Sequence, residues 1–199
     1  MKILLQIAAL ALVVTVHAQG TSEAVLNFTT PISGNVSGTA GWTFQPVSSI
    51  SVTGLGAFSY VVMNHGPIQV ALWDSGGNLL ASNTITASSG VTNVTRYESV
   101  TPVQLSPGIT YYLGAYSGSG SMLLDAVTPD FGSVSLSPDI HLRGTAQNTG
   151  GFGFPTENAG PDGAIYLGPN FRYQFVPEPS AFALLVIGVV ALAGLKRKR

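Results

Sequence analysis

The sequence predicts an all-β fold, an antiparallel β-sandwich of jelly-roll type, for the body of the chain. Short runs rich in valine, isoleucine, threonine and tyrosine recur between turn residues, as is typical of a sandwich or a barrel. Residues 19–175 contain 22 glycines, 10 prolines and no lysine, so long helices are hard to build. The two most apolar stretches lie at the extreme ends. One domain is therefore expected over residues 19–175, with separate roles for the ends.

Short apolar or alternating runs predict the individual strands. The predicted strands are Ala24–Phe28, Gly41–Phe44, Ile50–Phe58, Ile68–Asp74, Leu79–Thr86, Tyr97–Leu105, Thr110–Tyr116, Ser121–Leu124, Ile140–Arg143, Ala164–Leu167 and Phe171–Phe175. Within Ile68–Asp74, alternation places Ile68, Val70 and Leu72 on one face. This strand is expected to have one buried face and one wetter face.

Two connections have the composition of tight turns. Residues 74–78, Asp-Ser-Gly-Gly-Asn, tolerate positive φ and predict a hairpin between Ile68–Asp74 and Leu79–Thr86. Residues 106–109, Ser-Pro-Gly-Ile, have proline and glycine at the central positions of a type II turn. This second turn is expected to pair the strand ending at Leu105 with the strand ending at Tyr116.

The N-terminal end has the parts of a secretory signal peptide. Lys2 supplies a positive charge, residues 3–16 form an unbroken apolar run, and Ala18 follows where a signal peptidase would cut. We therefore expect residues 1–18 to be removed between Ala18 and Gln19. The rest of the chain is then exported.

The C-terminal end, residues 176–199, has three parts in a fixed order. These are a motif at 176–180 containing Pro177, Glu178 and Pro179, an uncharged segment at 181–195, and the basic cluster Lys196, Arg197, Lys198 and Arg199. The fifteen uncharged residues predict a transmembrane helix. A helix of this length would span ~22 Å, which is shorter than the ~30 Å hydrocarbon core of a membrane. The segment is therefore only marginally long enough to serve as a permanent anchor. The basic cluster holds its end in the cytoplasm.

This tail resembles the PEP-CTERM sorting signal. The resemblance implies recognition by an exosortase, a membrane-embedded peptidase that removes the helix and the basic cluster. The prolines of the Pro177-Glu178-Pro179 motif suit that role, because they keep the segment extended just outside the membrane. A plain C-terminal anchor with an incidental pair of prolines is the alternative.

Part of the body resembles an uncharacterised β-sandwich domain that is found in PEP-CTERM proteins. The features that match are Gly41-Trp42-Thr43-Phe44, the strand at 50–56, Val70-Ala71-Leu72-Trp73-Asp74 with Gly77, residues 79–82, the turn at 105–108 leading to Tyr111, and Gly168-Pro169-Asn170-Phe171. The segment at 64–68 is shorter than in that family. The resemblance implies a fold and export but no ligand, because a fold does not name a function.

Charge and cysteine content exclude several classes of function. Between residues 19 and 175, three arginines stand against eight acidic residues, a net charge of −5. Nucleic-acid binding is disfavoured because it needs clustered basic residues. The chain has no cysteine, which excludes disulfides, thiol nucleophiles and thiolate metal sites.

The sequence assigns no catalytic residue and no cofactor. Outside the signal peptide, His65 and His141 are the two histidines, and neither lies in a catalytic motif. His65 is expected in a loop, and His141 on a strand whose same face carries Asp139 and Arg143, the pattern of a polar surface stripe. A Gly-x-Ser-x-Gly nucleophile elbow is only mimicked by residues 118–120.

Two kinds of binding site were weighed for the body. Calcium would suit acidic loops of a secreted β-domain, but solvated loop acids are favoured for Asp125, Asp130, Asp139, Glu157 and Asp162, and no metal site is assigned. Glycan binding would use aromatic rings beside polar groups. The candidates are Tyr60, Trp73, Tyr97, Tyr112, Tyr116 and the Phe152/Phe154 loop, most of which are expected to serve the core or the sheet surface.

These observations predict an exported, non-enzymatic surface or extracellular-matrix protein. Its expected partners are signal peptidase and exosortase, the membrane through its C-terminal helix, and an extracellular polysaccharide as candidate ligand. A hydrolase or lyase acting on polysaccharide is the alternative, and it would need two carboxylates facing one cleft. Ice binding is less favoured: the tail class is sometimes labelled after ice-binding proteins, but residues 84–86 hold a single Thr-x-Thr.

Overall fold

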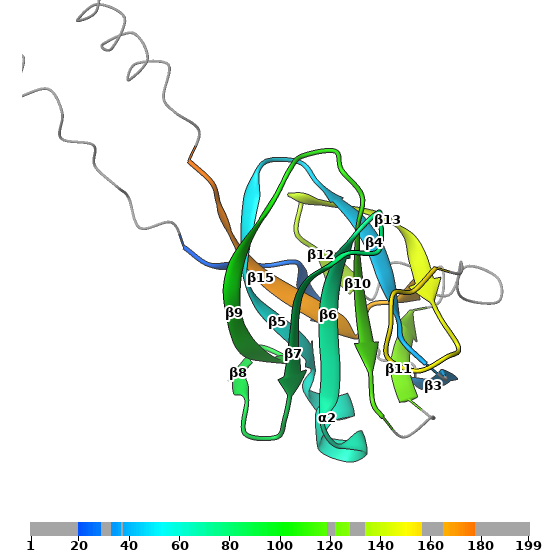
Figure 1. The fold of residues 1–199 in the computed structure, drawn as a ribbon. Coiled ribbons are helices and arrows are strands. Elements are labelled where there is room, and N and C mark those ends of the chain that lie inside the picture. Colours follow the sequence, from blue (N-terminus) through cyan, green and yellow to red (C-terminus); the bar gives the residue numbers. More distant parts are fainter. Residues whose placement is uncertain are drawn as a thin grey trace, which may run out of the picture.

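A computed structural model describes residues 20–28, 33–36, 38–118, 122–127, 134–156 and 165–177. The described chain is built mainly of antiparallel strands, as predicted, and forms two five-stranded sheets packed face to face (Figure 1). The prediction of an all-β sandwich is therefore confirmed. The predicted signal peptide and the predicted helix at 181–195 lie outside the described residues. No helix in the described ranges is long and apolar enough to cross a membrane.

The first sheet, called the β5 sheet, has the order β1-β15-β5-β9-β8. Its strands are β1 (Ser22–Glu23), β15 (Pro169–Phe175), β5 (Ile50–Phe58), β9 (Thr95–Leu105) and β8 (Gly90–Thr92). The second, called the β10 sheet, has the order β13-β4-β10-β6-β7. Its strands are β13 (Ile140–Gln147), β4 (Ala40–Pro46), β10 (Tyr111–Tyr116), β6 (Ile68–Asp74) and β7 (Leu79–Ile85).

Shorter elements complete the described fold. A three-stranded sheet joins β14 (Ile165–Tyr166), β11 (Met122–Val127) and β3 (Ser33–Val36), and a two-stranded one joins β12 (Val134–Leu136) and β2 (Val25–Phe28). The helix α2 (Ser59–His65) follows β5 directly and buries Val61 and Val62. His65 therefore ends a helix, and its expected place in a loop is wrong. No side chain caps the start of α2, so the sequence carried little sign of it.

Aromatic side chains from both sheets fill the core between them. Trp42 and Phe44 of β4 meet Phe171 of β15 at ring-centroid distances of 5.9 and 4.8 Å. All three rings are fully buried, as is Tyr173. The indole nitrogen of Trp42 donates to the carbonyl of Pro169 at 2.8 Å. Burial of each such ring stabilises the fold by about 1.5–3 kcal/mol, so β4 and β15 hold the two sheets together.

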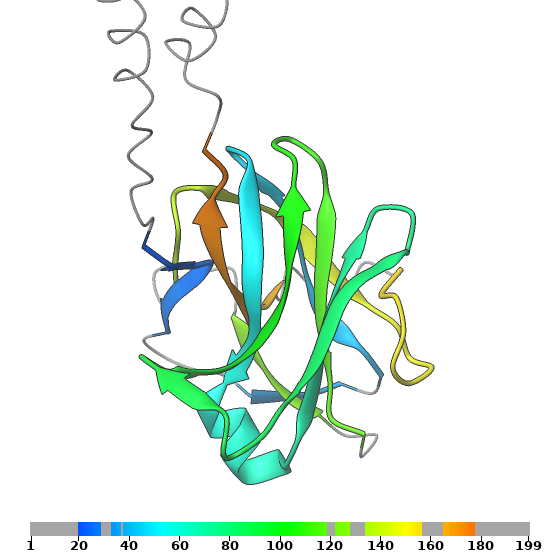
Figure 2. The same cartoon turned by 60° about the vertical axis from the view of Figure 1, so that its left-hand side comes forward.

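The two ends of the described chain leave the sandwich side by side. In Figure 2 the orange β15 lies between the cyan β5 and the blue N-terminal segment. Ser22 pairs with Tyr173 and Glu23 with Arg172 in antiparallel register. Beyond β15, the amide of Val176 donates to the carbonyl of Ser49 at 3.0 Å. The last strand is thus an inner strand of the β5 sheet, and that sheet is complete only when residue 175 is in place.

The two predicted turns have different outcomes. The hairpin of β6 and β7 is confirmed, and Asp74 closes it by accepting the amides of Gly76 and Asn78, each at 2.9 Å. At the second turn Gly108 has a φ of 71°, as a type II turn requires. The expected pairing across it is wrong, however. β9 pairs with β5 and β8, and β10 pairs with β4 and β6, so this turn carries the chain from one sheet to the other.

Strand β6 differs from the expected alternation of a buried and a wetter face. Ile68, Val70 and Leu72 are buried in the core as predicted, but Ala71 and Trp73 on the other face are buried too. The cause is a segment of residues 148–156, called here the aromatic loop, whose Phe152 and Phe154 rings lie 5.9 and 6.3 Å from the Trp73 ring. Around Trp73, the outer face of the β10 sheet is therefore covered by the chain itself.

Candidate functional site

Two hollows lie on either side of β1. The larger, called the β1 cleft, has a volume of about 480 Å³ and is lined by Thr21, Ser22, Glu23, Leu26, Thr92, Asn93, Ser137, Pro138 and Asp139. The smaller, called the Gly54 hollow, has a volume of about 290 Å³ and is lined by Thr21, Thr53, Gly54, Tyr97, Glu98, Ser99, Arg172 and Gln174. Hydroxyl, amide and charged groups line both hollows, and Leu26 and Pro138 add apolar surface to the β1 cleft. Because the β1 cleft has the size of a ligand pocket, it is the candidate functional site.

Glu23 is held at one side of the β1 cleft by Arg172 of β15 and by Asn93 of the turn between β8 and β9. Its position follows from its register opposite Arg172, whose guanidinium lies 3.6 Å from the Glu23 carboxylate. The Asn93 amide donates to the same carboxylate at 3.2 Å. Arg172 also donates to the hydroxyl of Thr92 and lies over the Tyr97 ring, 4.0 Å from its centroid. The charge of Glu23, whose exposure is 8 %, is thus balanced inside the fold.

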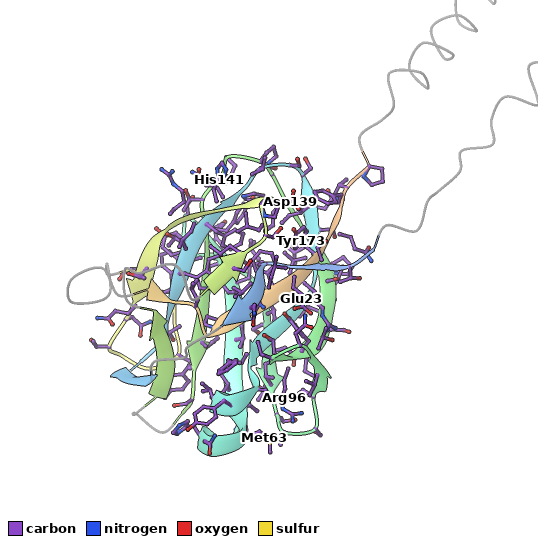
Figure 3. The ribbon with its side chains drawn as sticks, turned by 180° about the vertical axis from the view of Figure 1, so that it is seen from behind. Glu23, Met63, Arg96, Asp139, His141 and Tyr173 are labelled. Atoms are coloured by element: carbon purple, nitrogen blue, oxygen red, sulfur yellow. The ribbon has the colours of Figure 1, made fainter. Side chains whose placement is uncertain are left out.

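Asp139 is held at the other side of the β1 cleft by two hydroxyl groups. Its Oδ2 atom accepts from Tyr173 at 2.9 Å and from Ser137 at 3.2 Å, and these two hydroxyls are 2.7 Å apart. Figure 3 shows Glu23, Tyr173 and Asp139 in succession along this side of the molecule. Burial raises the pKa of Tyr173 to about 12, and Asp139 adds to the shift. Tyr173 therefore acts as a neutral donor that fixes the carboxylate.

Asn170 anchors the N-terminal segment that carries Glu23. This fully buried side chain accepts the amide of Val25 and donates to its carbonyl, both at 2.9 Å, and donates to the hydroxyl of Tyr97 at 2.7 Å. Burial raises the pKa of Tyr97 far above its ordinary value, with Glu23 adding to the effect. The residues 22–25 are therefore fixed on the β5 sheet, although β1 has only two residues.

Two oxygen atoms at the β1 cleft keep hydrogen-bonding capacity. Both contacts to the Asp139 carboxylate involve Oδ2, so Oδ1 has no hydrogen-bond partner within the described ranges. Asn93 uses its amide nitrogen on Glu23, and its side-chain oxygen accepts nothing from that part of the chain either. Asn93 has a φ of 51°, which asparagine tolerates better than most residues. Leu26, 40 % exposed, adds an apolar surface. The cleft can accept hydrogen bonds and contact a carbon face.

The aromatic candidates for glycan binding are mostly covered. Trp73 is 3 % exposed and Tyr97 5 % exposed, so neither ring offers a face to a sugar. Tyr112 packs edge-on against Phe154 at 4.8 Å, and Tyr116 lies 6.3 Å from Phe152. Tyr60, at 55 %, and Phe152, at 37 %, are exposed. Both lie away from the residues that line the β1 cleft.

The polar residues singled out in the sequence are spread over the fold. His141 and Arg143 are exposed on β13, as a surface stripe predicts, whereas Asp139 precedes that strand and bonds to Ser137 and Tyr173. Asp125 lies in β11, so its expected place in a loop is wrong. Among the residues with described placement, no three acidic or histidine side chains form a metal-binding group. Asp130, Glu157 and Asp162 lie outside them.

The residues predicted to serve in sorting and cleavage lie mostly outside the described ranges. Pro177 is described and exposed, directly after Val176. Ala18, Gln19, Glu178, Pro179 and the basic cluster at 196–199 fall outside the described ranges. Sequence reasoning missed Glu23, Asn93 and Arg172 as neighbours, since no motif joins positions so far apart. Residues 168–171, which include Asn170, did match the closing strand of the uncharacterised β-sandwich domain that the body resembles. That match was a sequence signal for this part of the site.

A family model for a domain of unknown function, DUF4082, matches residues 27–166. The match includes Asn93 and Asp139 but not Glu23 or Arg172, so the β1 cleft combines matched residues with the two flanking segments. No curated protein matches the chain. The match spans well over half of the sequence, and the chain therefore belongs to the DUF4082 family.

Proposed function

We propose that this protein is exported, held in the inner membrane by its C-terminal helix, and cut by an exosortase for display at the cell surface or in the extracellular matrix. The agreement of signal peptide, Pro-Glu-Pro motif, apolar segment and basic cluster supports this route. So does the position of Pro177, exposed and two residues after β15 ends. Both ends leave the sandwich together, so cuts at both ends would leave the fold intact.

At its destination the domain acts as a non-enzymatic glycan-binding or structural module, and the sandwich of jelly-roll type serves as its rigid support. The observation that carries this role is the β1 cleft, a hollow of about 480 Å³ in which hydrogen bonds fix the carboxylates of Glu23 and Asp139 and Leu26 presents an exposed apolar side chain. Its groups come from strands of the sheet rather than from loops alone. Such a site suits recognition of a hydroxyl-rich surface.

A polysaccharide hydrolase or lyase is the second candidate, favoured by one observation: Glu23 and Asp139 line the same cleft. Glycoside hydrolysis needs one carboxyl that keeps its proton, usually in apolar surroundings. Here Glu23 forms an ion pair with Arg172 and accepts a hydrogen bond from Asn93. The hydroxyls of Ser137 and Tyr173 donate to Asp139. These partners suit carboxylates that accept hydrogen bonds, so binding is preferred over turnover.

Mass spectrometry of the protein from its native host tests the route. The expected mature chain begins at Gln19 and ends near Pro177–Pro179, in the outer or extracellular fraction. Mature protein that keeps both Met1 and Arg199 there would refute the proposed processing. Incubation with polysaccharides tests the role separately: reducing ends or unsaturated products that disappear with Glu23→Gln would establish the enzyme instead.

A further inference from the structure

We infer that the β1 cleft binds a neutral, hydroxyl-rich oligosaccharide and discriminates against polysaccharides that carry carboxylates. The inference deepens the proposed glycan-binding role and rests on it. It assigns the site to the side of the molecule that carries Glu23 and Asp139 in Figure 3, instead of the aromatic side. The ligand's hydroxyls donate to Asp139 and Asn93, and its carbon face lies on Leu26.

The hydrogen-bonding atoms of the cleft set the class of ligand. Oδ1 of Asp139 and the side-chain oxygen of Asn93 are acceptors without partners in the described structure, whereas the Tyr173 hydroxyl already donates to Asp139 and the Nη2 atom of Arg172 already contacts Glu23 and Thr92. A neutral sugar offers several hydroxyl donors close together and can satisfy both acceptors. A ligand that covers these oxygens without donating to them removes their water and leaves each acceptor unpaired, at a cost of about 1–3 kcal/mol, so a ligand without donors at these positions binds poorly.

Charge excludes the acidic polysaccharides. The carboxylate of Glu23 is paired with Arg172, but the described structure places no cation against Asp139. The cleft therefore carries one uncompensated negative charge, within a body whose net charge is −5 over residues 19–175. A uronate approaching Asp139 meets like charge, which costs binding free energy.

Rigidity makes the acceptors available in one arrangement. Ser137 is 5 % exposed and its hydroxyl lies 2.7 Å from that of the fully buried Tyr173, so the Asp139 carboxylate cannot turn without breaking both bonds. The amide of Ser137 donates to the carbonyl of Ala24 at 2.9 Å, which ties the 137–139 turn to the N-terminal segment. A preorganised cleft loses little entropy on binding.

The experiment titrates neutral gluco-, xylo- and manno-oligosaccharides and an oligogalacturonate into full-length protein, in a detergent without a sugar headgroup. Asp139→Asn keeps an acceptor for Tyr173 but presents an amide donor to the ligand, so affinity for the bound neutral sugar is expected to fall about tenfold. Leu26→Ser and Asn93→Ala are expected to weaken binding severalfold. Oligogalacturonate is expected to bind wild type at least tenfold more weakly than the neutral sugar.

Matched controls locate the site. Glu98→Gln removes the same charge from the Gly54 hollow, and Leu79→Ser removes a leucine that is 52 % exposed on β7; neither is expected to change affinity. Thermal unfolding confirms that each variant is folded, and Leu26→Ser, at an exposed position, keeps the test valid if Asp139→Asn unfolds.

The outcomes separate the two levels of the proposal. Binding of neutral sugar that survives all three cleft variants, or is lost with Phe152→Ala, overturns the cleft and leaves a glycan-binding function. Preference for oligogalacturonate overturns the charge argument. A wild-type protein that binds none of the neutral sugars overturns the glycan-binding role together with this inference.

Discussion

The outer faces of the two sheets differ in what covers them. On the β10 sheet, the aromatic loop covers Trp73 and Tyr112 with Phe152 and Phe154. Thr39 fixes this loop, because its hydroxyl donates to the carbonyl of Gly151 at 2.9 Å and accepts the amide of Gly153 at 3.0 Å. On the β5 sheet, the hollows beside β1 are lined by polar and charged groups.

This contrast teaches that Trp73 and Tyr112, which look like candidate sugar-stacking rings in the sequence, serve packing on the β10 sheet, while the hollows beside β1 present carboxylate, amide and hydroxyl groups. Trp73 lies outside the main core cluster yet is as buried as a core residue. Glu23 and Arg172 are charged, yet they meet on an ordered strand pair. If that division is right, substitutions on the β10 face should affect stability most. Those at the β1 cleft should affect it least.

The largest effect is expected for Trp73→Ala, which removes a ring that is 3 % exposed. Loss of the ring leaves a cavity between β6 and the aromatic loop, and we expect a loss of about 3–5 kcal/mol in the free energy of unfolding, measured with urea. Phe152→Ala, at a half-exposed ring of the same cluster, should cost clearly less. A change below about 1 kcal/mol for Trp73→Ala would mean that the loop does not cover the sheet in solution.

A second large effect is expected for Asn170→Ala beneath the N-terminal segment. The change leaves the amide and carbonyl of Val25 and the hydroxyl of Tyr97 without their partner, so we expect a loss of about 2–4 kcal/mol. Hydrogen exchange at residues 23–25 should quicken more than exchange in β6. Asn83→Ala, which removes two exposed hydrogen bonds, one to the Ser99 carbonyl and one from the Thr84 amide, is the control and should cost under about 1 kcal/mol. Equal effects of the two changes would contradict the anchoring role.

High pH should lower the free energy of unfolding through ionisation of Tyr173 in the β5 sheet. Because the folded protein raises the pKa of Tyr173 to about 12, above its ordinary value of 10.0, the ring keeps its proton in the fold where the unfolded chain releases it. The resulting stability, about 2–3 kcal/mol, is fully present below pH ~10 and is lost as pH rises towards ~12. Urea unfolding at intervals from pH 9 to 12 measures it. In Tyr173→Phe the part of the decline due to this ring should vanish, and an unchanged decline would show that another group causes it.

Local pattern predicted much of the fold but not how its parts pair. The bounds of Ile50–Phe58 and Ile68–Asp74 were predicted to the residue, since runs rich in β-branched and apolar residues are local signals. The pairing of β9 with β10 was wrong because a Pro-Gly turn fixes a chain reversal but not the sheet that the next strand joins. The short strands β1 and β8 were not predicted, since two or three residues carry no periodicity.

The candidate site was less predictable than the strands. Its groups come from positions 23, 93, 139 and 172, and only register and burial bring them together. Asp139 was singled out, but as part of a strand stripe or an acidic loop, whereas the structure places it against Tyr173. Aromatic content pointed to Trp73, which the fold buries. Sequence pattern can show which residues suit a sheet, but the choice of open face depends on the tertiary path of residues 148–156.

The smallest effect is expected for the pair of Glu23 and Arg172, compared in a double-mutant cycle of Glu23→Gln and Arg172→Met. The charges lie 3.6 Å apart and the Arg172 side chain is 27 % exposed, so solvent screens their attraction. We expect a coupling of about 0.5–1 kcal/mol in urea unfolding, reduced in 1 M salt, with the contact to Tyr97 adding to the cost of losing Arg172. A coupling above about 3 kcal/mol would place the charged pair among the main determinants of stability. The two faces would then differ in chemistry but not in their importance for the fold.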